Sequence, residues 1–201
     1  MHRATTPLVA VALVIVGMLG LIVTVAYVQP VAFSGTATAG GTDAMFIERM
    51  IPHHDDAIEM AELALTRAEH PEIKQLAADV KRTQTAENAQ MRTWYREWFG
   101  TAVPDVGVSS PMMSGMMGSG AGSMADLEVA EPFDKAFIEA MIPHHQMGIM
   151  MSQMAGRTSA RPETRGLTSS IIEAQSAEIA KMQAWYDEWY GRRFSGSAPD
   201  N

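Results

Sequence analysis

The sequence predicts an all-α fold, in which one four-helix bundle built from two duplicated helical hairpins follows an N-terminal transmembrane helix. The first observation is that residues 43–100 and 134–191 repeat the same landmarks without a gap, including Met-Ile-Pro-His-His at Met50 and Met141. The second is that apolar residues in each copy recur with the three-and-four spacing of a helix with one buried face. The third is an uncharged apolar run near the amino terminus.

Residues 1–28 contain this apolar run, from Leu8 to Val28. A helix needs about 20 apolar residues to span a bilayer, so the run predicts a single-pass anchor in the cell membrane. Arg3 precedes the run and the next basic residue is Arg49, which places the rest of the chain on the extracytoplasmic side. The alternative is a cleaved signal peptide and a secreted protein. Residues 29–42, rich in Gly and other small residues, are predicted to form a flexible tether.

Each copy reads as two helices. Asp43 is a candidate N-cap, and Pro71 suits the first turn of the second helix. Gly100 and Gly191 stand where left-handed C-terminal caps belong. Neither hairpin can bury its apolar faces alone, so we expect one bundle over residues 43–191 with approximate twofold symmetry. Residues 192–201 are predicted to be a disordered tail.

Residues 101–133 separate the copies and are rich in Gly, Ser and Pro. So long a stretch without helical periodicity is unusual in a compact domain and is typically functional or disordered. It is either a plain linker or an accessory loop that collects soft metal ions through thioether sulfur. The methionines of that accessory loop are Met112, Met113, Met116, Met117 and Met124.

Composition narrows the function. The formal net charge is −8, and no block of Lys or Arg is present, so nucleic acid is not an expected partner. The absence of cysteine excludes disulfides and thiolate metal sites. His, Met and carboxylates remain as metal ligands, and the chain has 17 methionines.

Two helical stripes carry the candidate ligands. In the second copy, helical spacing aligns Met141 and His144 with Met147, Met151 and Met154. In the first copy the same slots hold Met50, His53, Asp56, Met60 and Leu63, so we expect the second copy to be the stronger site for a soft metal. The ordinary alternative is that these methionines fill the core.

The second helix of each hairpin has further candidate ligands along one face. Gln84, Glu87, Met91 and Trp94 follow one face, and the second copy repeats them as Gln175, Glu178, Met182 and Trp185. A carboxylate on such a face is costly to bury without a partner, so we expect Glu87 and Glu178 to face the histidine pairs. Helical spacing alone leaves open which histidine of each pair, His53 or His54 and His144 or His145, points inward.

Together these strings resemble a known family. "FIERMIPHHDDAIEMA" and "FIEAMIPHHQMGIMMS", each followed by a helix ending in "WYREW" or "WYDEW", resemble the bacterial Domain of Unknown Function 305 family from residue 43 to 191, apart from the linker. The resemblance implies a ferritin-like bundle, and copper binding as in the Met-rich periplasmic members. It assigns metal handling to Met50, His53, His54, Met60, Glu87, Met91, Met141, His144, His145, Met151, Glu178 and Met182.

We therefore expect an extracytoplasmic protein that sequesters, buffers or delivers copper, mainly Cu(I) and by the same chemistry Ag(I). No organic cofactor and no enzymatic turnover are expected, and a copper-delivery protein is an expected partner. The oligomeric state stays open. One alternative is a ferritin-like di-metal oxidase, which would use Glu48, Glu87, Glu139 and Glu178 with His. Another is a helical module that docks a partner protein through its Met-rich surface and binds no metal.

Overall fold

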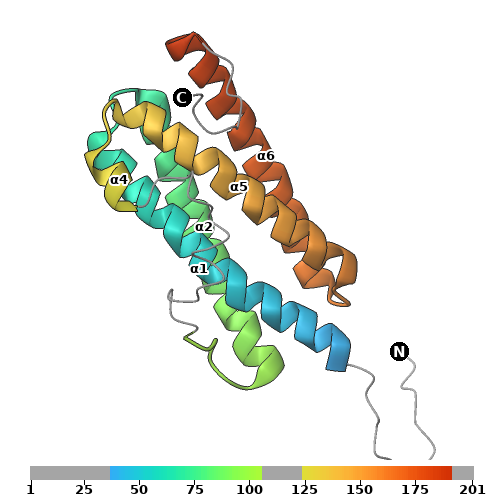
Figure 1. Ribbon diagram of the computed structural model, residues 1–201. Coiled ribbons are helices and arrows are strands. Elements are labelled where there is room, and N and C mark those ends of the chain that lie inside the picture. Colours follow the sequence, from blue (N-terminus) through green and yellow to red (C-terminus); the bar gives the residue numbers. More distant parts are fainter. Residues whose placement is uncertain (1–36, 106–123, 192–201) are drawn as a thin grey trace, which may run out of the picture. The chain divides into compact units, whose positions relative to one another are not determined.

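The computed structural model describes residues 37–105 and 124–191. In these two ranges the chain forms only helices: α1 (Ala37–Arg67), α2 (Pro71–Phe99), the short α4 (Met124–Val129), α5 (Phe133–Thr158) and α6 (Pro162–Tyr190) (Figure 1). The prediction of an all-α fold with four long helices in two hairpins is confirmed.

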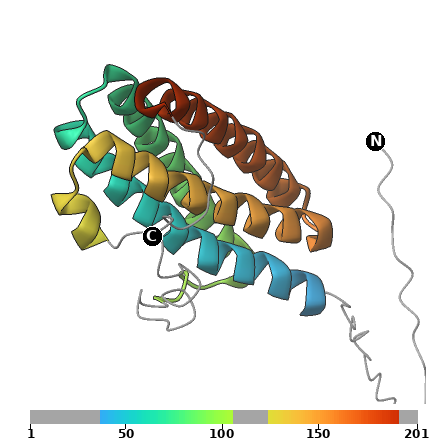
Figure 2. The same ribbon diagram turned by 45° about the horizontal axis from the view of Figure 1, so that its top comes forward.

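The two hairpins pack through their first helices. α1 pairs with α2, α5 pairs with α6, and α1 lies against α5 between them (Figures 1 and 2). The two copies of the Met-Ile-Pro-His-His string lie on α1 and α5. This interface therefore brings both copies to the middle of the bundle. Pro52 and Pro143 lie inside these helices without ending them.

The second helix of each hairpin begins and ends where the proline and glycine residues predict. α1 ends at Arg67 and α2 begins at Pro71, as the His-Pro-Glu string predicts. Gly100 (φ 72°) and Gly191 (φ 63°) adopt the left-handed conformation, and each donates its backbone N–H to the last turn of its helix. A residue with a Cβ would be strained at either position.

α1 begins earlier than predicted, at Ala37, so Ala37–Thr42 is helical and does not belong to a tether. Asp43 is an interior, fully buried residue of α1 and not its N-cap. Its carboxylate accepts a hydrogen bond of 2.5 Å from the Ser159 hydroxyl and pairs with Arg161, both from the loop between α5 and α6. Asp43 therefore does not cap the helix through its own backbone neighbours. Its carboxylate is bound by residues far along the chain, and α1 continues through this position.

The matched loop is held in the same way. Asp134 of α5 accepts the backbone N–H groups of Glu69 and His70, and His70 Nδ1 lies 2.6 Å from its carboxylate. His70 also stacks on Trp189, as Arg161 stacks on Trp98. Each hairpin loop is thus fastened to the helix ends of the other copy, which fixes how the hairpins meet.

The segment between the copies is partly helical. α4 lies within the predicted linker, with Leu127 buried and Met124 packed against the core. Met124 thus packs against the apolar core, as methionines commonly do, and its role as a ligand stays a prediction. The loop methionines Met112, Met113, Met116 and Met117 lie outside the described residues.

Other predictions also fall outside the described ranges. These are the membrane segment within residues 1–28, the first part of the tether and the tail at 192–201. Among the helices of 37–105 and 124–191, none is long and apolar enough to cross a membrane.

The core has two apolar clusters, one toward each end of the bundle. One cluster contains buried residues of α1 from Ala57 to Ala64 and of α5 from Phe133 to Ile142. The other contains buried residues of α1 from Phe46 to Ile51, together with Ala155 of α5. Between them lies a layer of polar side chains, which we call the polar belt. It comprises His53, His54, Gln84, Glu87, Asn88, His144, His145, Ser152, Gln175 and Glu178.

Candidate metal centre

His53 and His144 form the middle of the polar belt. Their imidazole rings stack across the α1–α5 interface, with centroids 3.8 Å apart and planes only 3° from parallel. Both side chains are buried, with exposed fractions of 2% and 5%. The first histidine of each pair therefore faces the other copy, and the two meet at the pseudo-twofold axis.

Burial keeps both of these rings neutral at physiological pH. It lowers the pKa of His53 to about 3, with smaller effects from the neighbouring His54 and His145. It also lowers the pKa of His144 well below its usual value, and His53 adds to that effect. A neutral imidazole keeps a lone pair available, so these rings are chemically able to bind a metal without first losing a proton.

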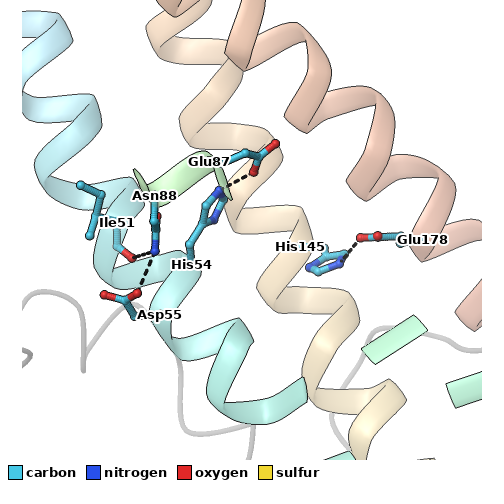
Figure 3. A network of polar contacts seen from close by, with 7 residues as sticks. All are labelled: Ile51, His54, Asp55, Glu87, Asn88, His145 and Glu178. Atoms are coloured by element: carbon cyan, nitrogen blue, oxygen red, sulfur yellow. Dashed lines mark hydrogen bonds and ion pairs between the residues drawn. The ribbon is translucent and has the colours of Figure 1, made fainter. Parts of the chain in front are cut away.

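His54 and His145 face the second helix of their own hairpins. His54 Nε2 lies 2.8 Å from a carboxylate oxygen of Glu87, and His145 Nε2 lies 2.7 Å from a carboxylate oxygen of Glu178 (Figure 3). Both rings are fully buried, whereas the Glu87 and Glu178 side chains are 14% and 16% exposed. The expectation that the two glutamates face the histidine pairs is correct, and the structure identifies the second histidine of each pair as the partner.

This hydrogen bond leaves the other ring nitrogen free. When Nε2–H donates to a carboxylate, Nδ1 carries the lone pair. Nδ1 of His54 and Nδ1 of His145 are buried and have no hydrogen-bond partner in the described part of the chain. A histidine that binds a metal typically donates its second N–H to a carboxylate in this way, which orients the ring and makes it more basic.

Buried methionines stand one helical turn from the residues of each histidine–glutamate pair. Met50 stands one turn before His54 on α1, and Met91 stands one turn after Glu87 on α2. Met50 and Met91 are both fully buried in the same apolar cluster. Because helical side chains lean toward the preceding turn, we expect the His54 ring to lie over the turn that holds Met50. We call this group of Met50, His54, Met91 and Glu87 the first hairpin site.

The second copy repeats the group without a change of residue type. Met141 and Met182 are fully buried in one apolar cluster, and they flank His145 and Glu178 at the same spacings. These four residues form the second hairpin site. The two copies are therefore equivalent at their buried candidate ligands. Their candidate ligands differ only along the rest of the first helix, where the second copy has more methionines than the first.

The sulfur-rich stripe of α5 runs from the core to the surface. Met141 and His144 are buried and Met147 and Met151 are half-buried, but Met154 is 63% exposed. In the first copy, Met60 packs into an apolar cluster. These methionines thus do not converge on one buried point, because a helix of this length passes through both the belt and one end of the bundle. Met150, 39% exposed on the same face, was not among the predicted ligands, although its spacing from Met147 and Met154 could have revealed it.

The polar belt carries a high density of buried polar atoms without partners. Within the described residues, buried atoms without a hydrogen-bond partner are found on both stacked histidines, on Nδ1 of His54 and His145, and on Gln84, Asn88, Ser152 and Gln175. Outside the belt they are Thr164 Oγ1 and Asp43 Oδ2, and the latter is in an ion pair with Arg161. A buried polar group without a partner costs roughly 1–3 kcal/mol. A packed bundle that concentrates this cost in one layer fits a layer that binds a ligand.

Two of the four glutamates that the di-metal oxidase alternative would use bind tyrosine hydroxyls. Glu48 accepts a hydrogen bond from the Tyr95 hydroxyl, and Glu139 accepts one of 2.6 Å from the Tyr186 hydroxyl. In the ranges that the structure describes, no three or more imidazole, thiol or carboxylate groups come together in a way that could hold a metal. A donor set rich in Met and His fits a soft ion better than a hard one.

Comparison with known proteins places this geometry in context. The family described as domain of unknown function (DUF305) matches residues 43–186. A viral relative, the uncharacterized protein L153 of Acanthamoeba polyphaga mimivirus, is 38% identical over 55 residues. That match spans 36% of the viral protein and 27% of this chain.

Solved structures share this fold. CopM in the Cu(I)-bound form is 47% identical, with a TM-score of 0.66 over 74% of this chain and 98% of CopM. CopM in an Ag-bound form is 45% identical over the same shares, with a TM-score of 0.64. A DUF305 fragment from Deinococcus radiodurans is 28% identical over 73% of this chain and 96% of the fragment, with a TM-score of 0.63. The bundle described above is thus also the fold of solved DUF305 proteins.

Proposed function

This chain belongs to the DUF305 family, and we propose that it binds Cu(I), and Ag(I) by the same chemistry, at its two hairpin sites. The close structural similarity to CopM, which has been solved with Cu(I), Cu(II) and Ag bound, supports a copper-handling role. The proposal adds the location of the ions, the ligands and their number.

One observation supports this assignment of ligands most directly. In both hairpins a fully buried histidine donates Nε2–H to a glutamate and keeps an unpartnered Nδ1. One fully buried methionine stands one helical turn before that histidine, and another stands one turn after the glutamate. Two thioethers and one imidazole form a soft donor set, which suits Cu(I) and Ag(I). Thioethers stay unprotonated at any ordinary pH. The glutamate orients the ring and needs no direct contact with the metal.

We propose storage, buffering or delivery in place of turnover. A buried ion with three protein donors is shielded from solvent, which suits holding it more than exposing it to a substrate. The proposed location is the extracytoplasmic side of a membrane, as the apolar run and the distribution of basic residues predict.

Titration with Ag(I), a redox-inert probe, tests the proposal. Thr36–Asn201 forms a compact unit by itself, so this segment is used, with Met112, Met113, Met116 and Met117 changed to Leu to remove the loop thioethers. We expect the bundle to retain two Ag(I) ions per chain against a competing chelator, and Cu(I) to behave likewise without oxygen. The same titration with the loop methionines restored measures whether the loop adds capacity.

Matched variants locate the ions. Met50→Leu with Met91→Leu keeps the volume of the first hairpin site but removes its sulfur, and should abolish one ion. Met141→Leu with Met182→Leu should abolish the other. Met45→Leu, at a methionine of α1 that is 51% exposed, is the control and should change nothing. Retention of both ions by the variant with all four buried methionines replaced would refute the ligand assignment. A bundle that retains neither Ag(I) nor Cu(I) would refute the function.

A further inference from the structure

The two hairpin sites have the same candidate ligands but different surroundings. In the first hairpin, the Asn88 side chain of α2 reaches across to α1, where its Nδ2 donates to the backbone oxygen of Ile51 (3.3 Å) and to the carboxylate of Asp55 (2.7 Å) (Figure 3). Asn88 is only 5% exposed, so its amide is largely shielded from competing water. We call Asn88, Ile51 and Asp55 together the Asn88 clamp.

The Asn88 clamp lies directly beside the first hairpin site. Asn88 follows Glu87 on α2, and Asp55 follows His54 on α1. The clamp therefore joins the two helices at the residue next to each partner of the His54–Glu87 hydrogen bond. When α1 moves away from α2, this hydrogen bond and both bonds of the clamp must break together. Asn88 is thus placed to hold the first hairpin closed around its site.

The second hairpin cannot form a counterpart of this clamp. The residue that corresponds to Asn88 is Ile179, and the residue that corresponds to Asp55 is Gln146. The side chain of Ile179 has no hydrogen-bond donor, and it packs against one of the two apolar clusters. At this level α6 is therefore joined to α5 by apolar packing and by the contact between His145 and Glu178.

The helices of the second hairpin also contain more glycine. Residues 134–190 include Gly148, Gly156 and Gly166, whereas residues 43–99 contain no glycine. All three glycines lie inside α5 or α6. A glycine inside a helix favours the open chain, because it loses more conformational freedom on folding than other residues do. We therefore expect local opening to cost less free energy in the second hairpin than in the first.

Local opening matters for the metal because the ligands are enclosed. The proposed metal-binding residues of both sites are fully buried; they are Met50, His54, Met91, Met141, His145 and Met182. An acceptor outside the bundle can reach an ion among these side chains only when the helices of that hairpin move apart. We therefore expect the rate of release from each site to follow the frequency with which its hairpin opens.

We propose that the two sites have different tasks: the first hairpin site, closed by the Asn88 clamp, retains its Cu(I) ion, and the second hairpin site releases its ion to an acceptor. Asn88 is a positioning residue, since it holds the helices that carry the ligands and does not bind the ion. The chain thus combines a storing site and a delivering site with identical ligands. This inference rests on the proposed function, because it requires one ion at each hairpin site, and it adds which of the two sites supplies an acceptor.

Hydrogen–deuterium exchange of the apo segment Thr36–Asn201 tests the difference in opening without any metal. We expect the backbone amides of α5 between His145 and Ser152 to exchange faster than their counterparts of α1 between His54 and Ala61. Asn88→Ile gives the first copy the residue of the second, and it should raise the exchange rate in this part of α1 by roughly tenfold, since two hydrogen bonds are lost. Equal protection of the two hairpins in the wild type would overturn the proposal.

Release is measured with Cu(I). The same segment, with the loop methionines replaced as above, is loaded without oxygen and mixed with excess bathocuproine disulfonate, whose Cu(I) complex is coloured. We expect a fast and a slow phase of equal size. The variant without sulfur in the first hairpin site should keep only the fast phase, and the variant without sulfur in the second should keep only the slow phase.

Two reciprocal variants test the role of the clamp in release. Asn88→Ile should accelerate the slow phase alone, by roughly tenfold. Ile179→Asn with Gln146→Asp transfers the clamp to the second hairpin and should slow the fast phase alone. Arg82→Ala, which breaks an exposed hydrogen bond to Asp79 on α2, is the matched control and should change neither phase.

The outcomes separate the clamp from the proposed function. A slow phase that belongs to the second site, or a slow phase that Asn88→Ile leaves unchanged, would overturn the proposal. Acceleration of both phases by Asn88→Ile would show a general loss of stability and would overturn the positioning role of Asn88. Unequal exchange in a segment that retains no Cu(I) would overturn the proposed function, while it would establish the effect of the clamp on local opening.

Discussion

The stacked pair of His53 and His144 makes a quantitative prediction about acid stability. Burial lowers the pKa of His53 to about 3 and the pKa of His144 well below its usual value, whereas a histidine in an unfolded chain titrates near 6.5. Between these values the unfolded chain binds protons that the folded bundle excludes. The free energy of unfolding that each ring contributes is therefore fully present above about pH 6.5 and falls as the pH is lowered toward 3.

The magnitude follows from the width of this window. One pKa unit corresponds to about 1.4 kcal/mol, so at pH 5 each excluded proton costs about 2 kcal/mol, and the two rings together cost about 4 kcal/mol. This is a large share of the 5–15 kcal/mol that typically stabilises a domain. Removing one ring from the titration should recover its part of the loss.

Urea unfolding of the apo segment Thr36–Asn201, followed by circular dichroism with a chelator present, measures the effect at pH 7.5 and pH 5. For each variant, His53→Gln and His144→Gln, the difference between the two pH values is compared with that of the wild type. Packing losses that do not depend on pH cancel in this difference, as do the contributions of other titrating groups. We expect each variant to lose about 2 kcal/mol less than the wild type between these pH values. Equal pH dependence in wild type and both variants would show that the folded bundle accepts these protons, and the reasoning would fail.

The remaining predictions concern carboxylates. Burial raises the pKa of Asp56 from 3.8 to about 6, with Glu59 and Asp55 adding to the shift. Ionisation of Asp56 therefore lowers the free energy of unfolding progressively from about pH 4, and the loss is complete above about pH 6. Asp56→Asn should therefore raise the free energy of unfolding of the apo bundle by about 1 kcal/mol at pH 7, after allowance for the partial exposure of the side chain. At pH 4 the same change should have almost no effect. Urea unfolding measures both values, and a lower stability of the variant at pH 7 would contradict the prediction. Asp134→Ala removes the acceptor for two backbone N–H groups of the α1–α2 loop, so it should lower the free energy of unfolding by about 3 kcal/mol. A loss below about 0.5 kcal/mol in the same assay would show that water satisfies these N–H groups in place of the carboxylate.

Local patterns in the chain account for much of the fold. The duplication, the hairpin break before Pro71 and the caps at Gly100 and Gly191 are all visible as residue types at fixed spacings. The line of Gln84, Glu87 and Met91 also faces inward as predicted, because helical periodicity determines which residues share a face. The start of α1 and the role of Asp43 were not predictable in this way, since Ser159 and Arg161 lie far along the chain.

For the candidate metal centre, too, some features follow from local patterns in the chain and others only from the tertiary structure. The sequence by itself determined which residues are available as ligands, and that two copies of them face the interior, because composition and helical spacing depend only on neighbours along the chain. Only the tertiary structure decided that His53 meets His144, that His54 and His145 turn to glutamates, and that Met154 points to solvent. The rotation of one helix against another is set by packing between distant residues, so the need for glycine at position 148, against which His53 and Gln175 pack closely, becomes visible only once α1, α5 and α6 are in place.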